Sequence, residues 1–264
     1  YLDGSARVAE ALGNRAVLVP YVGEHPDYDY FDTLDDNERL IEDWRGGANG
    51  RVMPWVGMEH LFYFTEDAWR RAVDMARRHG VGLHTHVGES QAEVRELEVR
   101  YGLRPVHAME RFGFLDVPQA LFAHCVWLDE SEIVLMAERG VGVAHNPTSN
   151  MKLVSGMAPV SRMIAAGVHV GLGTDGEKEN NNLDVLEEMK FAALLGKVRE
   201  DDATAADAWQ VLRMATIEGA RALGLGDELG SLEAGKKADL ITVRTDTPRM
   251  TPVLTGEFLN LHHN

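Results

Sequence analysis

Short apolar segments alternate with amphipathic segments along most of this 264-residue chain. The apolar segments have the length of β-strands, and the segments between them repeat apolar residues at helical spacing, as Trp69, Ala72, Val73 and Ala76 do. A chain that returns through a helix after each strand builds a parallel sheet covered by helices. The predicted strands are residues 16–19, 51–56, 81–86, 120–124, 141–145 and 168–172.

These six segments predict an α/β protein of the (β/α)8 TIM-barrel type, incomplete in this chain. No glycine-rich phosphate-binding fingerprint follows any of the strands, which disfavours a dinucleotide-binding fold. We expect residues 1–223 to form a barrel that lacks its first strands. Residues 203–223 are predicted as one helical region. Residues 224–264 are expected to belong to a small second unit, with a strand at 240–243.

The charge of the chain limits its partners. Asp and Glu number 42 against 26 Lys and Arg, a net charge of −16, which argues against nucleic acid and against an anionic membrane surface. No apolar run approaches the roughly 18–20 residues needed to span a bilayer. Cys125 is the single cysteine, so no intramolecular disulfide can form. We therefore expect a cytoplasmic protein.

Polar groups follow four consecutive predicted strands. His86 ends one strand with Glu89 three residues later, His124 and His145 end the next two, and Asp175 follows the last. A single histidine at a strand end is more often a structural residue, and an Asp before Gly is more often a turn former. The four together are harder to explain structurally, because parallel strands bring their carboxyl ends to one mouth of a barrel.

Histidine and carboxylate ligands without cysteine suggest one divalent metal, with Zn²⁺ expected first and Fe²⁺ or Mn²⁺ as alternatives. Such an ion lowers the pKa of a bound water to about 7. Glu89 is placed to take the proton that this water loses. A serine hydrolase is disfavoured, because Ser149 does not lie in a G-x-S-x-G motif.

The motifs of the chain resemble those of the amidohydrolase superfamily. Within it they are most similar to the branch of S-adenosylhomocysteine and methylthioadenosine deaminases and s-triazine hydrolases. The resemblance covers nearly the whole chain, with its motifs in the expected order. It implies that residues 1–223 are a metal-dependent hydrolase barrel and that residues 224–264 begin the return to a small accessory β domain. The matching segments are HTHVGES (84–90), AHCVWL (123–128), AHNPTSNMKL (144–153), GLGTDG (171–176) and GSLEAGKKADL (230–240).

The resemblance implies a role for each matching residue. His86 and Asp175 correspond to metal ligands, and Asp175 also orients the metal-bound water. Glu89 corresponds to the acid–base residue and also contacts substrate. His124 corresponds to a histidine that contacts the bound water or the substrate, and His60 aligns loosely with one that contacts a purine.

One expected motif is absent. The family's H-x-H pair on its first strand supplies two metal ligands, and no segment here can take that part. We expect the pair to lie upstream of Tyr1; the alternative is a metal-free, inactive protein. Asn146, Ser149 and Asn150 are assigned to holding the loop after the strand at 141–145. Residues 58–64 and 177–182 differ from the deaminase pattern, which leaves the substrate open.

The resemblance therefore implies a metal-dependent deaminase that uses water to release ammonia from an aminated nitrogen heterocycle. Candidate substrates are purine nucleoside thioethers such as S-adenosylhomocysteine and methylthioadenosine, or bases like guanine and pterin. Two alternatives stay open: an s-triazine-type hydrolase that removes chloride or an amine, and a non-catalytic, metal-free assembly subunit. We expect a homo-oligomer.

Overall fold

The computed structural model of the chain describes residues 2–28 and 31–248. Its strands all pair in parallel, as predicted for an α/β protein. β1 pairs with β2, and β3 to β7 pair with one another in chain order. The strands are β1 (Ala16–Leu18), β2 (Val52–Pro54), β3 (Val56–Gly57), β4 (Leu83–Val87), β5 (Ala120–His124), β6 (Gly142–His145) and β7 (His169–Leu172).

The strand predicted at residues 51–56 is divided into β2 and β3. The backbone N–H of Trp55 donates to Leu18 O at 2.9 Å, whereas the N–H of Val56 donates to Gly82 O at 2.9 Å. The segment therefore changes its hydrogen-bonding neighbour at Trp55, where one ladder ends and the next begins. The order of neighbours is still that of consecutive barrel strands.

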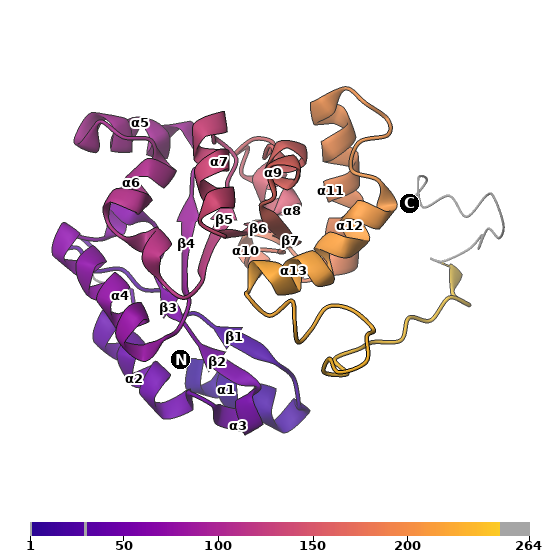
Figure 1. Cartoon of the computed structure of the whole chain (residues 1–264), viewed down its shortest axis with the longest axis horizontal. Coiled ribbons are helices and arrows are strands. Elements are labelled where there is room, and N and C mark those ends of the chain that lie inside the picture. Colours follow the sequence, from indigo (N-terminus) through magenta and orange to yellow (C-terminus); the bar gives the residue numbers. More distant parts are fainter. Residues whose placement is uncertain (1, 29–30, 249–264) are drawn as a thin grey trace.

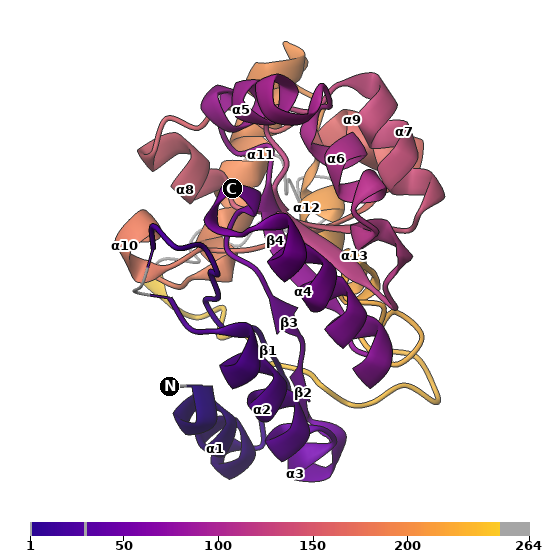
Figure 2. The same ribbon diagram turned by 90° about the vertical axis from the view of Figure 1, so that its left-hand side faces the viewer.

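Helices occupy the connections between strands (Figure 1). In Figures 1 and 2, α1 to α3 lie at one end of the molecule and α5 at the opposite end. The helices are α1 (Leu2–Leu12), α2 (Leu34–Trp44), α3 (Gly47–Gly50), α4 (Glu66–His79), α5 (Gln91–Tyr101), α6 (Pro105–Arg111), α7 (Glu130–Glu138), α8 (Pro147–Lys152), α9 (Val160–Ala166), α10 (Glu177–Asn180), α11 (Val185–Glu200), α12 (Ala208–Met214) and α13 (Ile217–Ala222), with 3-10 turns η1 (Leu61–Tyr63) and η2 (Phe114–Asp116).

Capping residues fix the helix boundaries. The Thr65 side chain accepts a hydrogen bond from Ala68 N at the start of α4, and Gly80 ends that helix with φ +62°. Asp129 and Glu132 form a capping box at the start of α7. These side chains satisfy backbone groups that the helix itself leaves unpaired.

The core lies between the sheet and its helices. Trp69 of α4 and Phe122 of β5 are fully buried in one hydrophobic cluster that runs from β3 to β7. The helix α13 also approaches β7 closely, because both elements carry glycine at the contact. A Cβ on Gly171 would lie 2.8 Å from the Cα of Gly219. Helices therefore pack closely against the strands that carry the site.

Two predictions for the end of the chain are wrong. Residues 203–223 form two helices, α12 and α13, because Thr216 adopts a non-helical backbone with φ −132° and ψ −101°. Residues 240–243 form no strand, and Ile241 is 79% exposed. A strand needs a neighbour to complete its ladder, and none of the described residues pairs with this segment.

The proposed domain boundary after residue 223 stays a prediction. Residues 224–248 contain no helix or strand, and residues 249–264 of the expected second unit lie outside the described residues. Arg15, which precedes β1, forms an ion pair with Asp239 at 2.8 Å and so ties this segment to the start of the chain. Among the described helices, none is long and apolar enough to cross a membrane.

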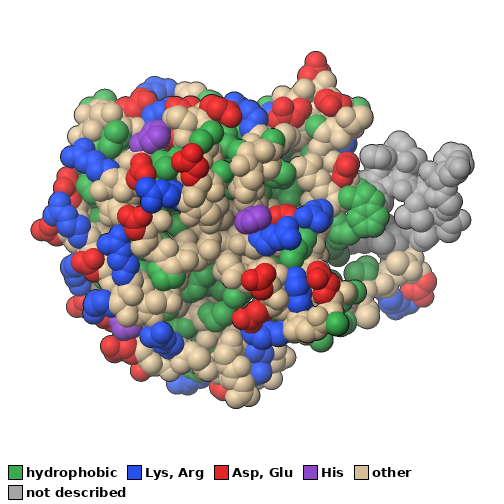
Figure 3. Space-filling view, in the orientation of Figure 1, with side chains coloured by type: hydrophobic (Ala, Val, Ile, Leu, Met, Phe, Trp, Pro, Cys, Tyr) green, Lys and Arg blue, Asp and Glu red, His purple; other side chains and the backbone are tan. Residues whose placement is uncertain are grey.

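The surface of the molecule carries mixed charges. Figure 3 shows acidic and basic side chains interspersed across the visible face. Among the described residues many charged side chains pair, as Arg139 does with Glu110 and with Asp116 at 2.9 Å or less. The face shown in Figure 3 therefore carries no single large acidic patch.

Candidate active site

The sheet brings the predicted site residues together. His86 is the second-last residue of β4, His124 and His145 are the last residues of β5 and β6, and Asp175 lies three residues after β7. The rings of His86 and His124 are stacked with centroids 5.3 Å apart. The His124 Nε2 lies 3.8 Å from an Asp175 carboxylate oxygen. His86 and Asp175 thus both lie next to the imidazole of His124, as expected for residues of one site.

His86 is oriented by the backbone of a neighbouring segment. Its Nδ1 donates to the carbonyl oxygen of Glu59 at 2.6 Å, which leaves the lone pair of Nε2 free for a ligand. Burial, aided by the charge of His60, lowers the pKa of His86 to about 4. The ring is therefore neutral at physiological pH, the form in which histidine binds metals.

His124 is held between two carboxylates. Its backbone has φ +68°, a conformation that L-residues rarely adopt and that often marks functional sites. Its Nδ1 donates to the side-chain oxygen of Asn150 at 2.8 Å. Its Nε2 lies 3.8 Å from Glu89 and 3.8 Å from Asp175. Glu89, the predicted acid–base residue, and Asp175, the predicted metal ligand, thus both lie next to this nitrogen.

Glu89 lies between two polar partners. One carboxylate oxygen accepts a hydrogen bond from the Ser155 hydroxyl at 3.0 Å, and the other lies 3.3 Å from His60 Nε2. Burial opposes ionisation, but His60, His124 and Ser155 together lower the pKa of Glu89 to about 2. The side chain is thus a carboxylate at neutral pH and begins as a proton acceptor.

His60 connects Glu89 to a second carboxylate. Its Nδ1 bonds to the Glu59 side chain while its Nε2 faces Glu89. Its ring stacks on His86 at 4.7 Å and on Phe62 at 5.0 Å. Although burial opposes protonation, the two carboxylates raise the pKa of His60 to about 10. His60 is therefore a buried cation at the edge of the site.

Asp175 is fixed by the residues around it. Its backbone has φ +61°. One carboxylate oxygen accepts from the Ser149 hydroxyl at 2.6 Å, and the other accepts from Gly176 N at 2.8 Å. Each carboxylate oxygen has a second lone pair, so these bonds orient the group without using up its capacity to bind a cation.

The donor set suits a divalent ion. The ligand-capable atoms of Glu59, His60 and His86 all lie within 4.8 Å of one another, and Asp175 is outside that group in the described part of the chain. Glu59 and His60 are already bonded to each other, however. The imidazole nitrogen of His86 and the carboxylate oxygens of Asp175 are the N and O ligands that zinc prefers.

Sequence reasoning missed the residues that support this site. Ser149 and Asn150, assigned to a loop, lie in α8 and bond directly to Asp175 and His124. Glu59 and Ser155 were not singled out at all. Their signal was weak, because Glu59 acts mainly through its neighbour His60, and Ser155 lies 66 residues from Glu89 in sequence.

Comparison with known proteins identifies the family to which the chain belongs. A profile described as the amidohydrolase family matches residues 3–260. The chain belongs to the amidohydrolase family. The resemblance inferred from the sequence motifs is thus confirmed.

Two curated relatives of this amidohydrolase are named as deaminases. The 5'-deoxyadenosine deaminase of Methanosarcina acetivorans is 45% identical over 253 residues, covering 96% of this chain and 58% of its own length. The 5-methylthioadenosine/S-adenosylhomocysteine deaminase of Desulforudis audaxviator is 44% identical over 255 residues, covering 95% and 58%. The amidohydrolase chain spans less than two thirds of the length of these relatives.

Solved structures agree with the barrel interpretation. An adenosine deaminase from Xanthomonas campestris with bound zinc superposes with a TM-score of 0.88 at 33% identity, covering 99% of this amidohydrolase chain and 61% of its own. An atrazine chlorohydrolase from Arthrobacter aurescens complexed with zinc superposes with a TM-score of 0.85 at 27% identity, covering 97% and 59%.

Proposed function

We propose that the protein is a hydrolytic deaminase of an aminated nitrogen heterocycle, with a purine nucleoside such as methylthioadenosine or S-adenosylhomocysteine as the first substrate to test. The observation that carries the proposal is the convergence of Glu89 and Asp175 on one nitrogen of His124, each at 3.8 Å. Relatives named as deaminases of adenosine derivatives support this choice of substrate.

His86 and Asp175 are the residues that would hold the metal, and zinc is the first candidate because structural neighbours bind it. When bound, a divalent ion lowers the pKa of water and so supplies the nucleophile at neutral pH. The Nδ1 bond of His86 and the Ser149 bond of Asp175 keep both side chains oriented for that task.

Glu89 moves the proton in this reaction. As a carboxylate it accepts a proton from the attacking water and delivers it to the ring nitrogen next to the reacting carbon. It then helps to pass a proton to the departing amine, which leaves as ammonia. Asp175 orients the attacking water and His124 contacts the same water or the substrate, and both side chains are held in place before the reaction begins.

His60 binds the heterocycle. Both of its ring nitrogens face carboxylates, so its contact with the substrate is by packing at the edge of the site, where Phe62 beside it offers an aromatic face. The oxo-heterocycle and ammonia are the products.

A second candidate is hydrolysis of an s-triazine, which the structural similarity to an atrazine chlorohydrolase favours. Attack by water at a ring carbon is common to both reactions, and only the leaving group differs. A metal-free assembly subunit is the remaining alternative. It is disfavoured because the chain keeps His86, Glu89 and Asp175 in one site.

We also propose that the protein acts in the cytoplasm as a homo-oligomer and binds no nucleic acid. The net charge of −16 supports the last point. The buried free thiol of Cys125 fits a reducing compartment. Sedimentation of the complete protein and metal analysis of the same sample test the oligomeric state and the presence of one ion per chain.

The deciding experiment measures ammonia and chloride release by the complete protein. The panel contains methylthioadenosine, S-adenosylhomocysteine, 5'-deoxyadenosine, guanine, a pterin and atrazine. Ammonia from an adenosine derivative, lost in Asp175→Asn but kept in the exposed control Asp227→Asn, supports the proposal. Full activity of Asp175→Asn would refute the assigned site, and chloride release alone would favour the second candidate.

A further inference from the structure

A cavity of about 630 Å³ is lined by none of the residues assigned to the site described above. It is bordered by the segment that follows β5, by the residues that follow α8, and by α5, α9 and α11. Its apolar lining includes Val126, Trp127, Leu128 and Met157. A volume of this size fits a small organic molecule.

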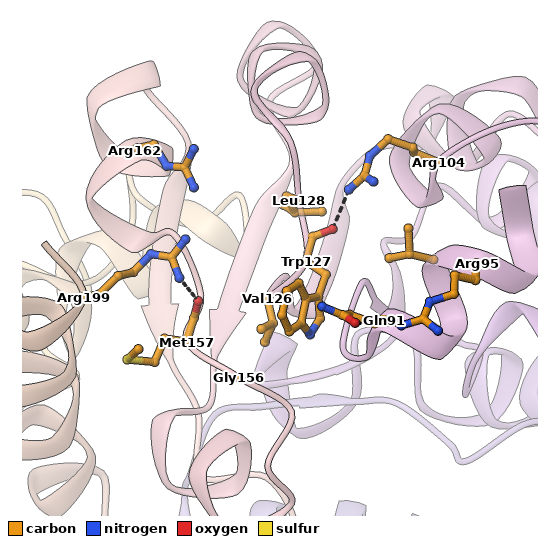
Figure 4. Close-up of a pocket in the computed structure, with 11 residues that line it drawn as sticks. Gln91, Arg95, Arg104, Val126, Trp127, Leu128, Gly156, Met157, Arg162 and Arg199 are labelled. Carbon is orange, nitrogen blue, oxygen red and sulfur yellow. Dashed lines mark hydrogen bonds between the residues drawn. The ribbon is translucent and has the colours of Figure 1, made fainter.

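Four arginines also line this cavity, although the chain is strongly acidic. Figure 4 shows Arg162 and Arg199 on one side, Arg104 and Arg95 on the other, and Trp127 with Val126 between them. Arg104 is neutralised, because its guanidinium lies 2.8 Å from Glu132 and 2.9 Å from Asp129. The other three are not paired in this way.

Arg162 and Arg199 lack close carboxylate partners. Their nearest carboxylates, on Glu130 and Glu200, are each 3.9 Å away, beyond hydrogen-bond distance. One N–H of Arg199 donates a hydrogen bond to the carbonyl oxygen of Met157. Burial and the nearby charge of Arg162 lower the pKa of the Arg199 guanidinium. Two guanidinium groups held near each other in this way favour an anion between them.

The apolar lining determines what kind of anion fits. Val126 and Leu128 are buried, and the indole of Trp127 is 36% exposed. The indole is held in place by its N–H, which donates to Ser155 O at 2.7 Å. Inorganic phosphate would meet the arginines and leave this lining unused, whereas a planar ring could cover it.

We propose that this cavity binds a small organic anion that joins a planar apolar body to a carboxylate or phosphate group. The charged group lies between Arg162 and Arg199, and the planar body packs against Trp127 and Met157. Arg95 completes the positive rim, since its only hydrogen-bond partner among the described side chains is Gln91 at 2.7 Å. The inference does not depend on the proposed catalytic activity.

Calorimetric titration of the complete protein tests this inference. Phenyl phosphate and benzoate are the charged probes, inorganic phosphate lacks the ring, and benzyl alcohol lacks the charge. We expect phenyl phosphate or benzoate to bind at least 10-fold more tightly than inorganic phosphate and benzyl alcohol. Whichever of the two binds more tightly identifies the charged group, and its affinity should fall as salt is raised.

Variants locate the binding. Arg162→Gln and Arg199→Gln should each weaken the better probe by about 10- to 100-fold, as expected for loss of a charge-assisted hydrogen bond. Arg70→Gln, an exposed arginine of α4 paired with Asp67, is the matched control and should bind normally. If Arg199→Gln does not fold, Arg199→Lys keeps the charge and should give an intermediate affinity.

Three outcomes would overturn the proposal: no probe binds, benzyl alcohol binds as tightly as the anions, or both glutamine variants bind like the unaltered protein. The last outcome would place the anion elsewhere, for example at the metal ligands. Binding that weakens in the two variants but not in Arg70→Gln supports the cavity.

Discussion

The hydroxyl of Ser155 lies 3.0 Å from a carboxylate oxygen of Glu89, although 66 residues separate the two in sequence. The bond joins the segment after α8 to the turn after β4. It gives the acid–base residue a fixed donor on the side away from His60, whose Nε2 lies 3.3 Å from the other oxygen. Glu89 is therefore held by neighbours whose removal can be measured one at a time.

Glu89→Gln should lower kcat for ammonia release by about 10²- to 10⁴-fold, because an amide cannot take up the proton of the attacking water. Glu96→Gln, an exposed change on α5, is the matched control and should leave kcat unchanged. Steady-state kinetics on the substrate found in the panel makes the comparison. Equal kcat for the two variants would contradict the assigned role.

Ser155→Ala should shift the pH profile. Loss of the hydroxyl removes a donor that stabilises the carboxylate, so the pKa of Glu89 rises from about 2. The acidic limb of kcat/KM should therefore move to higher pH, with a smaller loss of activity at neutral pH than in Glu89→Gln. A profile identical to that of the unaltered protein would show that this bond does not act on Glu89.

Ser149→Ala should weaken metal binding by about 10- to 100-fold, the usual cost of losing a partner of a ligating group. The hydroxyl of Ser149 donates to Asp175 at 2.6 Å and orients its carboxylate. Competition with a chromophoric chelator measures the affinity. Ser5→Ala, on the exposed side of α1, serves as the control, and a zinc affinity shared by both variants would argue against Asp175 as a ligand.

Gly142→Ala should destabilise the protein by about 1–3 kcal/mol through overpacking. A Cβ at this position of β6 would lie 2.1 Å from the carbonyl oxygen of Ala222 in α13, and backbone cannot move aside cheaply. Gly4→Ala, in α1 with no atom within 4 Å of its Cβ, should instead stabilise by about 0.5–1 kcal/mol. Urea unfolding of both variants measures whether each substitution raises or lowers the free energy of unfolding.

Glu38→Gln should lower stability more at neutral pH than in acid. The His79 ring and the Arg78 guanidinium hold the pKa of Glu38 below its ordinary value of 4.5. A lowered pKa contributes stability above that ordinary value and loses it as pH falls through the folded-state value. We expect a difference of about 0.2–1 kcal/mol at pH 7 and a smaller difference at pH 3, since the effect is lost as the pH falls below 4.5. Unfolding at both pH values, with Glu10→Gln as the exposed control, measures it.

Much of the fold could be predicted from local pattern. The apolar runs that end at His86, His124 and His145 alternate with capped helices, and this pattern was enough to predict a parallel α/β sheet. The division of residues 51–56 at Trp55 could not be predicted, because it depends on which neighbour accepts each backbone N–H. The helix α2 was missed, although Thr33 and Asp36 form a capping box that the sequence displays.

The candidate site, too, could be predicted from the sequence only in part. Residues at strand ends could be found because strand order places them at one edge of the sheet. Residues that act through others, such as Asn150 on His124, leave no such signal. Their importance depends on which rotamer a neighbouring imidazole adopts, and that is set by packing rather than by sequence spacing.

The Nδ1 atoms of His60, His86 and His124 are each bonded to an oxygen of the chain, supplied by Glu59 in the first two cases and Asn150 in the third. None of these rings can flip without breaking a bond that folding has already made. The orientation of these three rings is therefore set by hydrogen bonds within the protein. A divalent ion bound by His86 would find the ring already turned toward it and would require no rotation of these side chains.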